Sequence, residues 1–96
     1  MDIEIYAVKD KKSGWFMNPF PSRGVTDAIR SIREVTQDEK SFLHKYPMDY
    51  SLWLIAKMED TSGKVKTEEV LPDGTEVWKG PLFITEIESL HPNREK

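Results

Sequence analysis

Residues 3–35 read IEIYAVKD-KKSG-WFMNPFP-SRGV-TDAIRSIREV, and this stretch decides the fold. The alternation of side-chain types over residues 3–8 predicts a β-strand. Its expected inward face carries Ile3, Ile5 and Ala7. Residues 11–14 predict a hairpin turn, because Gly14 can take a positive φ. The aromatic residues 15–17 then form the return strand, and the prolines that follow are expected to end it.

An amphipathic helix is predicted next, from about Thr26 to Val35. Its apolar stripe recurs at helical spacing and comprises Val25, Ala28, Ile29, Ile32 and Val35. Arg30 and Arg33 project toward solvent from its polar side. The strand, the hairpin and this helix form the frame on which the later elements pack.

A shorter helix is predicted over residues 39–45, capped by Asp38 and ended by Pro47. Its expected apolar side carries Phe42, Leu43 and Tyr46. The strand predicted over residues 50–58 is apolar on both faces, which is typical of an inner strand or of one that a partner covers. Its faces are expected to carry Leu52, Leu54, Ala56 and Met58 on one side, and Trp53, Ile55 and Lys57 on the other.

A turn at residues 59–64 and a strand from Val65 complete a ββααββ order. This order predicts an α+β fold, a small antiparallel sheet with one or two helices packed on one face. The expected core residues are Ile3, Ile5, Ile29, Ile32, Phe42, Leu43, Leu52 and Leu54.

A chain of 96 residues is expected to form one domain, 1–96. Its core spans about residues 3–66, an elaborated tail follows at about 67–90, and residues 91–96 are expected to fray. Within the tail, residues 70–78 predict a hairpin about Pro72-Asp73-Gly74. The helical spacing of Ile84, Ile87 and Leu90, with Phe83 before them, predicts a short helix over residues 81–90.

Composition excludes several classes of protein. The absence of cysteine rules out disulfides and thiolate metal sites. We expect no targeting segment and no membrane association, since no apolar run approaches the roughly 20 residues of a membrane span. The net charge of −3 argues against a general nucleic-acid coat, but residues 1–48 carry +1 and residues 49–96 carry −4. This asymmetry fits either a local basic patch or two ordinary solvated surfaces.

Catalytic chemistry is sparse, and we expect the protein not to be an enzyme. Neither His44 nor His91 has a second metal ligand at suitable spacing, no glycine-rich phosphate loop is present, and no serine lies in a nucleophile elbow. We therefore predict no catalytic residue, metal site or cofactor. The carboxylates expected to be solvated are Asp49, Glu59, Asp60, Glu68 and Glu69.

One group of residues is compatible with nucleic acid. Its candidate members are Lys9, Lys11, Lys12, Trp15, Phe16, Arg23, Arg30 and Arg33. Cations can hold phosphates, and exposed aromatic rings stack bases without demanding a sequence. In the alternative interpretation, one of the two aromatic residues belongs to the core and the lysines only solubilise the hairpin tip.

The second apolar face of the strand at residues 50–58 predicts an oligomer interface at Trp53 and Ile55. A core this small cannot also cover the aromatic residues elsewhere, namely Trp15, Trp78 and Phe83. We therefore expect a homodimer.

Two blocks of sequence resemble the small nonstructural protein of gokushovirus-type microviruses, which are phages with single-stranded DNA genomes. The first is IYAVKDKKSGWF at residues 5–16, followed by Pro-Phe-Pro and Ala-Ile-Arg, and the second is FLHKYPMDYSLWLIAKMEDTSG at residues 42–63. The resemblance covers roughly residues 3–65. That family is grouped with the microvirus DNA-packaging protein and is often described as DNA-binding, with no known catalytic residue.

The resemblance implies a non-enzymatic nonstructural phage protein in the cytoplasm of the bacterial host. Its expected role is to bind single-stranded DNA and assist genome replication and packaging. The alternative is a protein–protein interaction module, a homodimer or an adaptor for a phage or host replication or capsid protein, without direct DNA binding. Binding to DNA weakens steeply with salt, whereas an apolar interface tolerates salt, so a salt titration separates the two.

Overall fold

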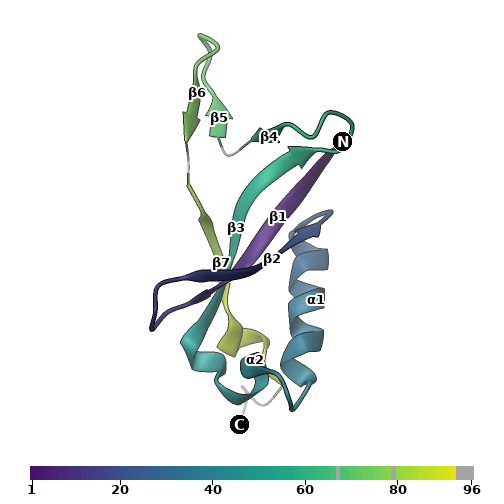
Figure 1. Cartoon of the computed structure of the whole chain (residues 1–96), viewed down its shortest axis with the longest axis vertical. Helices are drawn as coiled ribbons and strands as arrows, with labels where there is room; N and C mark the ends of the chain where they lie inside the picture. The colour runs from purple at the N-terminus through teal and green to yellow at the C-terminus, as the bar shows by residue number, and fades with distance from the viewer. Residues whose placement is uncertain (67, 79, 93–96) are drawn as a thin grey trace.

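A computed structural model of the chain describes residues 1–66, 68–78 and 80–92. Their elements are β1 (Asp2–Asp10), β2 (Phe16–Ser22), α1 (Val25–Gln37), α2 (Phe42–Lys45), the 3₁₀ helix η1 (Pro47–Asp49), β3 (Tyr50–Glu59), β4 (Val65–Lys66), β5 (Glu68–Val70), β6 (Glu76–Trp78), β7 (Leu82–Glu86) and the 3₁₀ helix η2 (Ile87–Leu90). Within these residues a five-stranded antiparallel sheet has the order β2-β1-β3-β4, and β7 also pairs with β3. With α1 packed along one side of the sheet (Figure 1), the α+β prediction is confirmed.

The core lies between α1 and one face of this sheet. Its buried members are Tyr6, Val8, Ala28, Ile32, Leu43, Leu52, Ile87 and Leu90. The expected inward face of β1 was wrong, because Tyr6 and Val8 meet the helix while Ile3 and Ile5 are only half-buried. Both faces of β1 are apolar enough to pack, so alternation alone could not decide between them.

The short helix α2 also differs from its prediction. It begins after Ser41, whose hydroxyl accepts a hydrogen bond from the backbone N–H of Leu43 at 3.1 Å, so Ser41 and not Asp38 is the cap. Leu43 is buried as expected, but Phe42 is 61% exposed and is no part of the core. Because α2 is a single helical turn, only a narrow side of it, which carries Leu43, packs against neighbouring elements.

A β-bulge in β3 redistributes the residues between the two faces of the sheet. Ile5 pairs with Ala56 while Tyr6 pairs with Leu54, so Ile55 is an extra residue in the ladder. Residues directly opposite each other in a ladder share a face. Ala56 therefore lies on the same face as Trp53, and the prediction that it shared a face with Leu54 was wrong.

A second bulge allows β2 to continue through its prolines. Val8 pairs with Met17 and Tyr6 pairs with Phe20, which leaves Asn18 and Pro19 opposite one residue of β1. Asn18 takes a positive φ of 52° at this point. The prediction that the prolines end the strand was wrong, because β2 is an edge strand and its outer side needs no N–H donor.

The tail contains one confirmed element and one corrected element. β5 and β6 form the expected hairpin, which projects from the sheet (Figure 1). Residues 82–86 form the strand β7 instead of a helix, because they pair with the half of β3 that β4 leaves open. Of the predicted helix, only η2 (Ile87–Leu90) is a helical turn, and its buried residues are Ile87 and Leu90.

The end of the tail is partly fixed. His91 does not fray, since its Nε2 donates to the backbone oxygen of His44 at 2.9 Å and the two imidazole rings are 4.8 Å apart. Residues 93–96, which were predicted to fray, lie outside the described residues. The side chain of Trp78 is also not described. In the described part of the chain, no helix has the length and apolar character needed to cross a bilayer.

We predict that Leu52→Ala lowers the free energy of unfolding by about 2–5 kcal/mol, because Leu52 is fully buried. The exposed Phe42 provides the comparison, and Phe42→Ala should change that free energy by no more than about 0.5 kcal/mol. Urea unfolding of both variants measures the difference. Equal losses in the two variants would show that the core is misplaced.

Stability should also depend on Glu59. Hydrogen bonds from Thr61, and then from the N-terminal amine, lower the pKa of Glu59 from 4.5 to about 2. Because the folded-state pKa is depressed, this stabilisation is present above pH 4.5 and is lost as the pH falls toward 2. Glu59→Gln should therefore flatten the fall of the melting temperature over that range, and an unchanged pH profile would contradict this assignment.

Candidate nucleic-acid interface

The face of the sheet away from α1 carries an aromatic row, which we define as Phe16, Trp53 and Phe83. The register assigns them to this face: Lys9 pairs with Phe16, Ala7 pairs with Trp53, and Trp53 pairs with Phe83. The core residues Tyr6, Val8 and Leu52 occupy the opposite face. We call the side with the aromatic row the open face.

The three rings are in edge contact with one another. Phe16 and Trp53 have ring centroids 5.7 Å apart at 89°, and Trp53 and Phe83 have centroids 5.6 Å apart at 78°. The indole N–H of Trp53 donates to Ser51 Oγ at 2.8 Å, which fixes the central ring. Phe16 is 41% exposed and Phe83 is 52% exposed, so two rings of the row are available to a ligand.

Lys9 supplies the positive charge of the open face. Its Nζ lies 5.4 Å from the centroid of Phe16 and 5.2 Å from that of Trp53. Both distances are within the range of cation–π interaction. The amine is therefore held beside the rings, at a position where it can also reach a phosphate.

The hairpin tip is nearly balanced in charge. Lys11 Nζ is 3.0 Å from Glu86 Oε2, and Lys12 Nζ is 3.3 Å from Asp49 Oδ2. The tip forms as predicted, with Gly14 at a φ of 81°. These two lysines can therefore contribute less net positive charge than their position in the sequence suggests.

Trp15 is 76% exposed, and it precedes β2. Strand alternation therefore does not decide its direction. Its backbone N–H donates to Ser13 Oγ at 3.2 Å, so its attachment is to the turn. Trp15 is therefore an exposed ring next to the hairpin tip.

The remaining predicted DNA-binding residues do not join this surface. Arg30 and Arg33 lie on α1, and the helix packs on the opposite face of the sheet. Arg30 lies 3.8 Å from Asp27. Arg23 follows the far end of β2, where its Nη1 contacts Met1 Sδ at 3.2 Å. The structure therefore separates the eight candidates into the hairpin with the open face, the helix, and the loop before the helix.

The sequence analysis did not identify the roles of three residues at this site, Phe83, Glu86 and Asp49. Phe83 was assigned to a helix, although the aromatic and β-branched side chains of residues 83–85 could have indicated a strand. Glu86 and Asp49 neutralise the tip lysines across long separations in sequence, and no local pattern reveals such pairs. Of the predicted oligomer interface, Trp53 is the central ring of the aromatic row and Ile55 is the half-buried bulge residue.

Carboxylates next to the hairpin tip act on Tyr50. Burial, followed by the carboxylates of Asp10 and Asp49, raises the pKa of Tyr50. Among the described residues, no three histidine, aspartate or glutamate side chains lie close enough together to hold a metal ion. The arrangement can offer ring faces and one cation to a ligand.

One family model matches the chain. The model is described as Phage ORF5 protein, and it matches residues 3–77. No curated protein and no solved structure matches the chain.

The exposure of the aromatic row leads to a stability prediction. Phe16→Ala and Phe83→Ala should each lower the free energy of unfolding by about 1 kcal/mol, since edge contacts between rings contribute about 0.5–1.5 kcal/mol. Thermal melts of the two variants test this. A loss as large as that of Leu52→Ala would mean that the rings belong to a core rather than to an accessible surface.

Proposed function

The chain belongs to the Phage ORF5 protein family, and we propose that it is a non-enzymatic nonstructural phage protein that binds single-stranded DNA through its open face. In this proposal it acts in the cytoplasm of the infected bacterium, where it assists replication and packaging of a microvirus-type genome. Binding is weak and independent of sequence.

The observation that carries the proposal is the aromatic row with Lys9 beside it. Every base has a π-face, so stacking on an aromatic side chain contributes about 1–3 kcal/mol per base without reading the sequence. Four-stranded sheets that bind RNA use the same principle, with aromatic residues stacking two or three bases on the sheet. Here two partly exposed rings flank a fixed central ring, which suits a short run of bases.

Charge limits the affinity of this interaction. Each phosphate neutralised by a lysine or arginine adds a salt-dependent term to binding. Lys11 and Lys12 are already paired with carboxylates, and the chain carries a net charge of −3. We therefore expect micromolar affinity or weaker near physiological salt, with stacking as the larger contribution.

The second candidate is an interaction module, in which the open face forms a homodimer through Trp53 and Ile55 or binds a phage or host replication or capsid protein. The charge balance at the tip favours this candidate. The exposed rings are too small to form such an interface alone: an aromatic side chain has about 150–250 Å², so Phe16 and Phe83 together expose only on the order of 200 Å², and the rest of the surface would have to supply the remainder. Stable interfaces bury about 800 Å² per partner. We therefore favour DNA.

The test is fluorescence anisotropy with a labelled single strand of about 25 nucleotides, longer than common site sizes. Phe16→Ala combined with Phe83→Ala should weaken binding about tenfold or more at every salt concentration, since 1.4 kcal/mol is tenfold. Phe42→Ala is the matched control, because it removes an exposed ring from α2. It should leave the affinity unchanged.

The same assay addresses the lysines. Lys11→Ala with Lys12→Ala should flatten the salt dependence by no more than roughly one to two units of slope. The absence of binding by the wild type at low salt would refute the proposal. If sedimentation then gave a dimer that Trp53→Ala dissociates, the interaction module would replace it.

A further inference from the structure

Two ion pairs hold the lysines of the hairpin tip, and both carboxylates come from other parts of the chain. Lys11 Nζ donates to Glu86 Oε2 at 3.0 Å, across 75 positions of sequence, and Lys12 Nζ lies 3.3 Å from Asp49 Oδ2. We call Asp49 and Glu86 the tip carboxylates. A DNA phosphate would pair with the same two amines. The tip carboxylates therefore compete for the charge that phosphates need.

Main-chain contacts hold both tip carboxylates in place. Glu86 pairs with Ser51 in the sheet, and its carbonyl accepts a hydrogen bond from Ser89 Oγ at 2.7 Å. The carbonyl of Asp49 accepts a hydrogen bond from the backbone N–H of Lys11 at 2.8 Å, which ties η1 to the turn. Because these backbones are fixed, pairing restricts mainly the lysine side chains, and the pairs form without any ligand.

Glu86 lies on the open face itself. Lys9 pairs with Ser51, Ser51 pairs with Glu86, and residues directly opposite each other share a face. Ser51 lies on the same face as Trp53, whose indole N–H donates to Ser51 Oγ. The carboxylate of Glu86 therefore shares a face with the aromatic row, where it opposes phosphates that approach the rings.

We propose that the tip carboxylates are internal competitors of DNA: a strand binds the tip by exchanging them for its own phosphates on Lys11 and Lys12. This inference rests on DNA binding by the open face and gives that binding a built-in restraint. The exchange is possible because both pairs are exposed, with Lys11 41% and Lys12 78% accessible. Exposed ion pairs contribute no more than about fivefold to an equilibrium.

The exchange favours strands over single nucleotides. A mononucleotide brings one base and one phosphate group, so it can replace only one of the two carboxylates. A strand brings stacked bases and neighbouring phosphates together, and the first contact raises the effective concentration for the second. The tip carboxylates thus select for chain length without reading the sequence.

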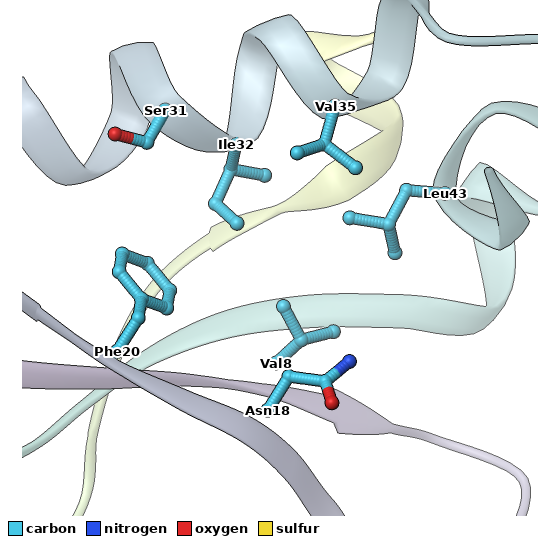
Figure 2. Close-up of a pocket in the computed structure, with 7 residues that line it drawn as sticks. All are labelled: Val8, Asn18, Phe20, Ser31, Ile32, Val35 and Leu43. Atoms are coloured by element: carbon cyan, nitrogen blue, oxygen red, sulfur yellow. The ribbon is translucent and has the colours of Figure 1, made fainter.

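The pocket on the helical side of the sheet offers no such exchange. Figure 2 shows Ile32 and Val35 of α1 facing Val8 and Phe20 of the sheet, and none of the described side chains that line this pocket is charged. A ligand bound there would displace neither tip carboxylate. Its affinity would therefore be the same in variants that lack them.

The test is fluorescence anisotropy at low salt with a labelled oligothymidine of about 25 nucleotides. Glu86→Gln and Asp49→Asn remove a charge but keep the shape of the side chain, and each should tighten binding about threefold, with about tenfold for the double variant. The salt slope should steepen by up to about 0.7 per lysine, since salt screens the wild-type ion pairs and removes the advantage of the variants.

Glu88→Gln is the matched control. It removes the same charge from an exposed residue of η2 close in sequence to Glu86, and it should leave the affinity nearly unchanged. A double-mutant cycle then separates the exchange from a general effect of charge. In a Lys11→Ala background, Glu86→Gln should lose most of its effect, because no lysine remains to be released.

Three results would overturn the restraint while wild-type DNA binding stands. They are a gain for Glu86→Gln no larger than that for Glu88→Gln, an equal gain in the Lys11→Ala background, and thymidine monophosphate bound as tightly as the strand. Binding by the double variant but not by the wild type would support the restraint and refute DNA binding by the native chain. Binding by neither protein would overturn both proposals.

Discussion

The pairing of β1 with β3 is the constraint on which the rest of the structure depends. The ladder runs along all of β1 and shifts once, at Ile55. Before and after this shift, the register decides which side chains meet α1 and which remain on the open face. Because Trp53 pairs with Ala7, whose small side chain leaves space beside it, the indole can lie on the sheet and contact both neighbouring rings.

The two faces that result have different chemistry. On the helical side, Tyr6, Val8 and Leu52 form a core with α1. On the open face, the amine of Lys9 lies beside the edge-packed rings of Phe16 and Trp53.

The sequence predicts the local features of this fold well. Alternation, a turn glycine and a helical stripe are local signals, and they identify β1, the first hairpin and α1. Apart from the cap of α2, which is a local feature, the main features that the sequence analysis missed depend on distant partners. β7 is a strand because β3 offers it an unpaired edge, and the Lys11–Glu86 ion pair joins residues 75 positions apart. The bulge at Ile55 reassigns Ala56 for the same reason, since only the partner strand reveals the shift.

The central claim is that single-stranded DNA is bound by the open face and not by the helical side. The most direct test is a ¹⁵N and ¹³C NMR titration of the protein with a short oligothymidine. The account predicts shifts concentrated at Lys9, Phe16, Trp53 and Phe83, with the helical arginines Arg30 and Arg33 unaffected. Shifts centred on those arginines, or on Ile32 and Val35 of α1, would contradict it.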